Sequence, residues 1–437
     1  MDWQISLLIL FGTLLLLMIL GMPVVFAFFA INLLGAFIFL GGESGLTQLA
    51  LNSAEAVSSF SLIPIPLFIL MGEVLFHTGL AYRAISAIER LISSVPGRLS
   101  IVSILGGTAF ATLSGSSIAN TAMMGSAMLP EMHRKGYHPS MSMGPIMAVG
   151  GIAMLIPPSA LAVTLASLAG ISISKLLIAG IVPGLLIGGA TLGYVVIRCS
   201  LNPQLAPSDD VEHFSRSEKW KPFFRDVVPL LGIFLVVIGS MVLGWASPTE
   251  SAAFGVVASF IAAICYQTLN RKSFLVSVFE TAKISTIILF ILVSSTTFSQ
   301  ILSFSGATTG LLNAFMSFEL SPIMVVAIMV VTLLILGCFT DQISMIMLTL
   351  PFFMPLVANL QIDVIWFGVL ILITMEISLL TPPFGLLLLV MKGVAPEGTR
   401  LGTVYKAAFP FLLLQIGILI TLVIFPEVAR FLPELIK

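Results

Sequence analysis

Long apolar runs separated by short polar segments cover the whole sequence. Many of these runs approach the roughly 20 residues that a helix needs to cross a bilayer. The first run, residues 1–20, has no basic n-region and no cleavage site, so we expect a retained span and not a signal peptide. The pattern predicts an all-α polytopic membrane protein.

One polar segment interrupts this pattern in the first half of the chain. Residues 111–121 contain Ser114, Ser116, Ser117 and Asn120 between two apolar runs. Non-helical backbone at membrane depth is tolerated only where protein or a water-filled cavity surrounds it. The segment predicts a re-entrant helical hairpin over about 99–131 whose tip binds a polar solute or an ion. Small residues used only for helix packing are the alternative.

A helix over about 140–169 follows, and Ile156-Pro157-Pro158-Ser159 interrupts it. Two adjacent prolines remove two backbone donors, so this span is expected to be broken. The second half contains the same pair of features, a hairpin over about 322–357 and a helix over about 360–395 broken at Thr381-Pro382-Pro383-Phe384.

The two halves share one sequence offset. Pro157-Pro158 and Pro382-Pro383 are 225 residues apart, as are Pro130 and Pro355. An offset that recurs at several features predicts an internal duplication.

The basic residues predict how the halves are oriented. If the loops at 77–98, 133–138, 198–225, 270–283 and 391–406 face the cytoplasm, sixteen of the nineteen Lys and Arg residues lie on that side. The first hairpin then enters from the cytoplasm and the second from outside. Two inverted-topology repeats with broken helices are typical of secondary transporters.

The expected organisation has five parts, and it includes amphipathic interfacial helices at 82–94 and 270–283. The parts are N-terminal scaffold spans over 1–60, a first repeat over 61–200, a cytoplasmic linker over 201–225, further scaffold spans with an arm helix over 226–283, and a second repeat over 284–437 that ends in a C-terminal span.

Composition narrows the class of protein further. Only 9% of the 437 residues are charged and 58% are hydrophobic, and the mean hydropathy is +1.14, whereas about a quarter of a soluble domain is charged. The net charge of −1 argues against a nucleic-acid partner. The three cysteines are widely spaced and the histidines lie near the ends of spans, so we expect no cofactor.

Four elements are expected to converge near the middle of the membrane: the tips at 114–120 and 337–341 and the breaks at 156–159 and 378–384. Exposed carbonyls and neutral side-chain oxygens suit Na⁺, and the positive ends of half-helices suit a carboxylate substrate. The predicted substrate-binding residues are Ser116, Ser117, Asn120, Pro158, Ser159, Asp341, Pro382 and Pro383.

Two acidic residues carry open alternatives. Asp341 is the one carboxylate beside a tip, and it is either a functional group or the N-cap of the following half-helix, or both. Glu376 either takes part in ion coupling or pairs with another helix.

An enzyme is disfavoured. Thr112-Leu113-Ser114-Gly115 approaches the Gly-x-Ser-Gly motif of intramembrane serine proteases, but no His lies inside a predicted span to serve as the base. A channel or a proton-coupled antiporter remains an alternative to a Na⁺-driven transporter.

The chain resembles the large membrane (permease) subunit of tripartite ATP-independent periplasmic (TRAP) transporters, in the ion-transporter superfamily. The resemblance covers essentially the whole chain, and four segments carry it. They are Leu113–Asn120, Leu155–Ser159, Gly337 with Asp341, Pro351 and Pro355, and Leu380–Gly385.

The resemblance implies an elevator-type, Na⁺-driven importer of organic acids in the bacterial inner membrane. It also implies a smaller membrane subunit and a periplasmic substrate-binding protein as partners. A stand-alone organic anion exchanger or channel without a binding protein is the alternative.

The resemblance further implies two Na⁺ sites. Ala153 and Ser378 stand where the family commonly has glycine. The implied ligands are Ser114, Ser117, Asn120, Ala153, Ile156 and Pro158 at the first site, and Gly337, Thr340, Ser378, Thr381 and Phe384 at the second.

Overall fold

The computed structural model describes residues 2–92, 97–114, 116–207 and 215–435, without the side chains of residues 112–114 and 216. Every regular element in these ranges is helical, and seven of the helices are long and apolar enough to cross a membrane. The prediction of an all-α polytopic membrane protein is confirmed.

The N-terminal region forms an antiparallel pair of spans followed by a more polar helix. Gly21, at φ +84°, makes the turn between the spans. The elements are α1 (Trp3–Leu7), the π-helical η1 (Leu8–Gly12), α2 (Thr13–Ile19), α3 (Val24–Phe39) and α4 (Glu43–Val57).

The first predicted hairpin and broken helix are both present. The hairpin consists of α7 and α8, and the helix over 140–169 ends at residue 154 and resumes at residue 160. The elements of this region are η2 (Phe60–Leu62), α5 (Pro64–His77), α6 (Leu80–Leu91), α7 (Arg98–Ser114), α8 (Ser117–Arg134), α9 (Pro139–Gly150), η3 (Gly151–Met154), α10 (Ala160–Ala169), α11 (Ile173–Ala179) and α12 (Ile181–Leu201).

Much of the cytoplasmic linker expected over 201–225 is helical in its described residues. Ser215 starts a helix, because its Oγ accepts from the Glu218 amide at 3.3 Å and the Glu218 carboxylate accepts from the Ser215 amide at 2.8 Å. This capping box satisfies amides that a helix start otherwise leaves unpaired. The elements are η4 (Pro203–Leu205), α13 (Arg216–Pro222), η5 (Phe223–Val227) and α14 (Val228–Val242).

The next two helices, α15 and α16, are long and apolar. α15 (Pro248–Cys265) begins with a capping box of Ser247 and Glu250. α16 (Arg271–Phe304) is one helix of 34 residues, about 50 Å long, and it packs on α3, α4 and α5. The stretch expected as an interfacial helix at 270–283 is the first part of α16, because no Pro or Gly interrupts the chain at 283–284.

The second half again forms a hairpin, α18 with α19, and a broken helix, α20 with α21. The C-terminal span is followed by one more helix, and that last helix was not predicted. The elements are α17 (Ala307–Met316), α18 (Pro322–Gly337), α19 (Gln342–Asn359), α20 (Val364–Leu379), α21 (Leu386–Val394), α22 (Leu401–Ile424) and α23 (Glu427–Leu435).

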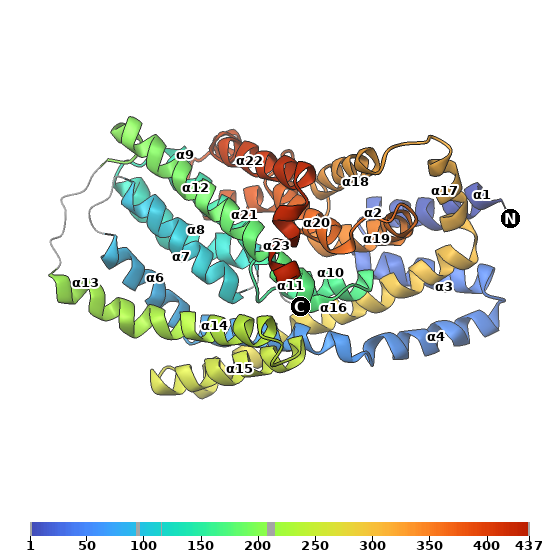
Figure 1. The fold of residues 1–437 in the computed structure, drawn as a ribbon, viewed down its shortest axis with the longest axis horizontal. Helices are drawn as coiled ribbons and strands as arrows, with labels where there is room; N and C mark the ends of the chain where they lie inside the picture. The colour runs from blue at the N-terminus through green and yellow to red at the C-terminus, as the bar shows by residue number, and fades with distance from the viewer. Residues whose placement is uncertain (1, 93–96, 115, 208–214, 436–437) are drawn as a thin grey trace.

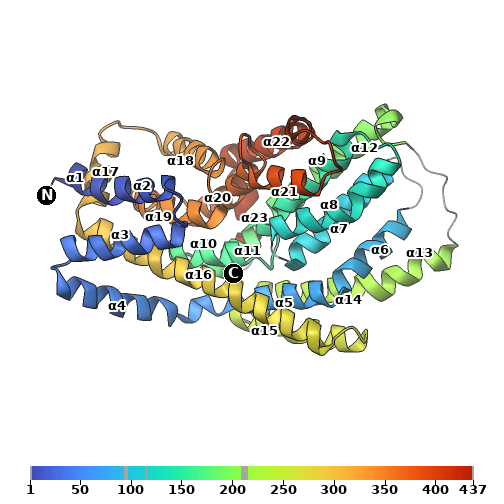
Figure 2. The ribbon, with the colours of Figure 1, turned by 180° about the vertical axis from the view of Figure 1, so that it is seen from behind.

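Figures 1 and 2 show an elongated molecule with α1 and α17 at one end of its long axis and α6 and α13 at the other. The α7–α8 hairpin lies towards the α6 end, and the α18–α19 hairpin lies towards the α1 end. α10, α11 and α20 lie between the two hairpins. The breaks of both interrupted helices are therefore near the centre of the molecule.

Candidate functional site

Three helices of the predicted site begin with a side chain that caps the backbone. The Ser116 hydroxyl accepts from the Ala119 amide at 3.2 Å at the start of α8, and Ser159 accepts from the Ala162 amide at 3.2 Å at the start of α10. Asp341 caps α19. These caps determine where each half-helix begins.

Asp341 is an N-cap, as one of its two interpretations predicted. Its Oδ2 accepts from the amides of Ile343 and Ser344 at 3.1 and 3.2 Å, and its Oδ1 accepts from the Ser344 hydroxyl. Asp341 is nevertheless an exposed residue. The carboxylate therefore both caps α19 and faces a space beside the helix.

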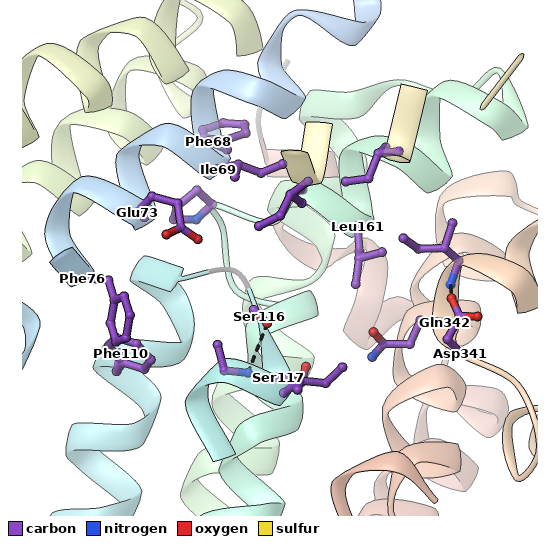
Figure 3. A pocket seen from close by; sticks show the side chains of 18 residues that line it. Phe68, Ile69, Glu73, Phe76, Phe110, Ser116, Ser117, Leu161, Asp341 and Gln342 are labelled. Atoms are coloured by element: carbon purple, nitrogen blue, oxygen red, sulfur yellow. Dashed lines mark hydrogen bonds between the residues drawn. The ribbon is translucent and has the colours of Figure 1, made fainter. Parts of the chain in front are cut away.

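That space is a cavity of about 350 Å³ in which the N-terminal ends of α8, α10 and α19 meet. Figure 3 shows Ser116 and Ser117, Leu161, and the pair Asp341 and Gln342 around it. α5 forms the opposite wall with Phe68 and Glu73, and α16 contributes Ile284 and Ile288. The cavity is thus enclosed by both hairpins, one broken helix and two other spans.

The charges in the cavity wall are negative. Among the described residues, Glu73 and Asp341 are its two ionisable lining residues, and no Lys or Arg lines it. Glu73 is paired with His77 on the next turn of α5, at 3.0 Å between Oε2 and Nε2. Any attraction that the cavity offers to an anion must therefore come from helix ends or from bound cations.

A polar cluster lies behind the first tip. The Ser117 hydroxyl donates to Glu376 Oε1 at 3.1 Å, and the Glu376 side chain is only 1% exposed. Glu376 forms no ion pair with any described residue. A Cβ on Gly151 would lie 2.5 Å from Glu376 Oε2, so η3 runs directly against this carboxyl. Glu376 thus links the broken helix α20 to the hairpin.

Two neighbours of Ser117 on α8 have unused polar atoms. Both amide atoms of Asn120 and the hydroxyl of Thr121 are fully buried and have no hydrogen-bond partner among the described residues. A Cβ on Gly150 would lie 2.4 Å from the Thr121 hydroxyl. Buried polar groups in proteins are nearly always paired, so unused atoms of this kind point to a bound ligand.

The second tip contacts α20 closely. A Cβ on Gly337 would lie 2.1 Å from Ser378 Oγ, so only glycine fits at this point. The hydroxyls of Thr340, Ser378 and Thr381 donate to carbonyls of their own helices at 2.9, 2.6 and 2.8 Å. Each oxygen keeps lone pairs for a further ligand.

The remaining predicted residues lie in the breaks. Ala153, Ile156 and Pro158 are buried, and Pro158 reaches the cavity wall. The second break is open, with Pro382, Pro383 and Phe384 exposed, and the Phe384 ring lies 5.8 Å from that of Phe339 on the second tip.

The structure therefore brings four predicted substrate-binding residues to one cavity, and these are Ser116, Ser117, Pro158 and Asp341. Asn120 and Ser159 are buried behind the wall, and Pro382 and Pro383 lie outside it. The side chain of Ser114 is outside the described residues.

Sequence reasoning missed several residues of the site. Glu73 is not among the predicted residues, although an acid in the apolar run 61–76 is a usable signal. Gln342, next to the second tip, and Thr121, next to the first, were polar residues in predicted hairpins and could have been included. Phe68 carries no signal, because one more aromatic in an apolar helix looks like core.

Comparison with known proteins agrees with this architecture. The C4-dicarboxylate TRAP transporter large permease protein DctM of Pseudomonas aeruginosa is 31% identical over 400 residues, which cover 91% of this chain and 92% of that protein. The sialic acid TRAP transporter large permease protein SiaM of Vibrio cholerae is 28% identical over 416 residues, 95% of each chain.

A solved structure shares the fold. The Alcanivorax borkumensis YdaH transporter superposes with a TM-score of 0.64 at 17% sequence identity, covering 90% of this chain and 91% of that one.

The family model for the DctM component of tripartite ATP-independent periplasmic transporters matches residues 11–428. Together with the seven apolar spans, this makes the protein a multi-pass membrane protein, of the inner membrane in bacteria. The chain belongs to the DctM family of TRAP transporter large permeases.

Proposed function

We propose that this permease imports an organic acid in symport with Na⁺. One observation carries the proposal: three helix N-termini meet at a cavity that no basic side chain of the described residues lines. Helix N-termini attract anions, but Glu73 and Asp341 oppose them in the same cavity. A carboxylate substrate therefore binds there best when cations are bound nearby, which is the thermodynamic requirement for symport.

The cluster behind the first tip fits Na⁺. Ser117 and Asn120 supply neutral oxygens. The amide oxygen of Asn120 has no hydrogen-bond partner among the described residues, so it is available to a cation. Backbone at Ala153, Ile156 and Pro158 would complete the site. The buried Glu376 carboxyl accepts from the Ser117 hydroxyl and offers a further oxygen next to the cluster.

The second tip fits a second Na⁺. Gly337 and Ser378 bring α18 and α20 into contact, and Thr340 and Thr381 lie within one turn of that contact. The hydroxyl oxygens already donate to their own helices, so only their acceptor sites remain, which suits a cation and not an anion. The Phe384 carbonyl would contribute from the break.

The proposed substrate class is a carboxylate. The Pseudomonas relative is named for C4-dicarboxylates and the Vibrio relative for sialic acid. Both compounds carry a carboxylate, which is the group that helix N-termini bind.

In the proposed mechanism, Na⁺ binding at both tips closes the polar clusters and completes the substrate cavity. The two hairpins and two broken helices then move as one body against a scaffold built from the other spans. Coupling requires that the ions and substrate bind one arrangement of this body more tightly than the empty one. A small membrane subunit would support the scaffold, and a periplasmic binding protein would deliver the substrate.

The test is uptake by proteoliposomes that contain this chain and its small subunit. Binding protein and labelled organic acids are supplied outside, with an inward Na⁺ gradient or with K⁺ replacing Na⁺ at equal ionic strength. We expect accumulation only when Na⁺ and the binding protein are both present. Flux that needs neither would contradict the proposal and indicate a stand-alone exchanger or channel.

A further inference from the structure

A second large cavity lies far from the proposed transport site. It has a volume of about 650 Å³ and lies between α6 on one side and α13 with η5 on the other. Figure 1 shows α6 and α13 next to each other at one end of the molecule. We call this cavity the basic groove.

The basic groove is lined by four exposed cationic side chains. Arg83 and Arg90 lie two turns apart on α6, and Lys221 and Arg225 lie one turn apart on the facing helix. Two rows of like charge that face each other across a groove repel unless an anion lies between them.

The two acids in the groove offset only part of this charge, because two carboxylates face four cations. The Glu218 carboxylate accepts from the Ser215 amide in the capping box and interacts electrostatically with Arg90, and Asp226 lies 4.0 Å from Arg225. Arg83, Arg90 and Lys221 form no ion pair with any described residue. The guanidinium of Arg83 lies over the ring of Tyr266 at 5.7 Å, which positions it without neutralising it.

Aromatic side chains border the groove on the helix that carries Lys221. Trp220 and Phe224 are 45% and 61% exposed, and with Phe223 they form a cluster with ring centroids 5.7–5.9 Å apart. Tyr82 on α6 is 58% exposed. Exposed aromatics are enriched where a membrane helix passes the lipid headgroups.

Trp220 and Lys221 lie near the start of the helical stretch Ser217–Val242, which is long and apolar enough to cross a membrane. The basic groove therefore lies at the membrane surface, on the side that holds most of the basic residues. We propose that it binds the phosphate headgroup of an anionic phospholipid, with the acyl chains along Trp220 and Phe224. Basic pockets between helices on the cytoplasmic side bind such headgroups in this way. The inference does not depend on what the permease transports.

Trp220 makes the site measurable by fluorescence quenching. The intact protein is reconstituted in phosphatidylethanolamine vesicles that contain an equal small fraction of brominated phosphatidylglycerol or brominated phosphatidylcholine. The contribution of Trp220 is the difference between the wild-type protein and Trp220→Phe. We expect brominated phosphatidylglycerol to quench Trp220 in preference to brominated phosphatidylcholine, with a saturable dependence on its fraction.

Charge variants decide whether the groove causes that preference. Arg90→Gln with Lys221→Gln should weaken it about 30-fold, because each basic side chain at an anionic surface contributes about fivefold. Arg90→Lys with Lys221→Arg should retain it, as should the control Arg271→Gln with Lys272→Gln, which removes two exposed charges outside the groove. Circular dichroism confirms that each variant is folded.

Two outcomes would overturn the proposal. Equal quenching by both brominated lipids, or an equal loss in the control pair, would mean that the groove does not select an anionic lipid. Loss of the preference in millimolar inorganic phosphate, with no loss in a phosphate-free salt of the same ionic strength, would mean that the ligand is a soluble phosphate and not a lipid.

Discussion

At the scale of single residues, the buried amide of Asn120 is the feature that most needs an explanation. Leaving a buried polar group unpaired costs about 1–3 kcal/mol, and Asn120 leaves both of its amide atoms unpaired among the described residues. The hydroxyl of Thr121, the next residue, is also unpaired among the described residues. A folded protein accepts this cost where a ligand repays it, and a cation bound to the amide oxygen would do so.

Asn120→Ala should therefore reduce the response to Na⁺ while it leaves folding intact. In Na⁺-free buffer the variant should unfold at the same temperature as the wild type or higher, because an unpaired amide is gone. Contacts to a charged group contribute about 1.5–3 kcal/mol, so the Na⁺ concentration for half-maximal uptake should rise about tenfold or more. Thermal unfolding and uptake against Na⁺ concentration measure both effects.

Thr191→Val provides the matched control. Its hydroxyl is also buried and unpartnered, but it lies on α12, away from both tips. This variant should leave the Na⁺ dependence unchanged. A wild-type Na⁺ dependence in Asn120→Ala would remove Asn120 from the proposed site.

Asp341 allows its two roles to be separated. Asn caps a helix about as well as Asp, so Asp341→Asn keeps the start of α19 but removes the charge. We expect Asp341→Asn to retain uptake and unfolding temperature, and Asp341→Ala to lose about 1 kcal/mol of stability and part of its uptake. Loss of uptake in Asp341→Asn with unchanged thermal unfolding would instead show that the carboxylate acts directly on substrate or ion.

At the scale of elements, the contact between the second tip and α20 depends on one missing side chain. Gly337→Ala would place a Cβ 2.1 Å from Ser378 Oγ and 2.3 Å from its Cβ. Overpacking of this kind typically costs about 1–3 kcal/mol, so the variant should unfold at a lower temperature and need more Na⁺ for uptake. Gly239→Ala on α14 meets nothing within 4 Å and serves as the control.

A second substitution makes this prediction specific. Ser378→Gly removes the two nearest atoms that the new Cβ would strike and leaves Met345 Sδ, at 2.7 Å, on a flexible side chain. The double variant Gly337→Ala with Ser378→Gly should therefore recover much of the lost stability. The coupling energy from the four proteins measures the contact directly. Additive losses in the double variant would mean that the close approach of α18 and α20 is not what Gly337 serves.

Local sequence was sufficient for the elements and insufficient for their contacts. Adjacent prolines and polar tips predicted both broken helices and both hairpins, because backbone chemistry acts within a few residues. The capping box at Ser215, also local, was overlooked, which is why the helix from Arg216 was interpreted as a loop. The continuity of α16 was hidden because its charged first turns look interfacial.

The residues of the site could be predicted only in part, because many of them meet through contacts between distant parts of the sequence. Ser117 and Glu376 are 259 residues apart in sequence, and no periodicity relates them. The facing wall of the cavity, with Phe68 and Glu73, comes from a helix that carries no motif. Such contacts follow from tertiary packing, which one sequence does not specify.

At the scale of the whole molecule, the cavity separates two sets of helices. One wall comes from the hairpins and a broken helix, and the opposite wall, apolar except for Glu73, comes from α5 and α16. If the hairpins and broken helices move as one body, contacts within that body must persist during transport and contacts with α5 must change. Two aromatic pairs of similar geometry report on these two cases.

The rings of Phe76 on α5 and Phe110 on α7 lie 5.6 Å apart across the proposed boundary. The rings of Phe353 on α19 and Phe367 on α20 lie 6.2 Å apart within the proposed moving body. Each pair is replaced by cysteines after Cys199, Cys265 and Cys338 have been removed. A homobifunctional methanethiosulfonate bridges cysteines that are too far apart for a direct disulfide. Cross-linking the Phe76→Cys, Phe110→Cys protein with it should abolish uptake, and reduction should restore it. The same treatment of the Phe353→Cys, Phe367→Cys protein should leave uptake unchanged. Full cross-linking across the boundary without loss of uptake would contradict a moving body, because transport would then proceed while α5 and the first hairpin stay joined.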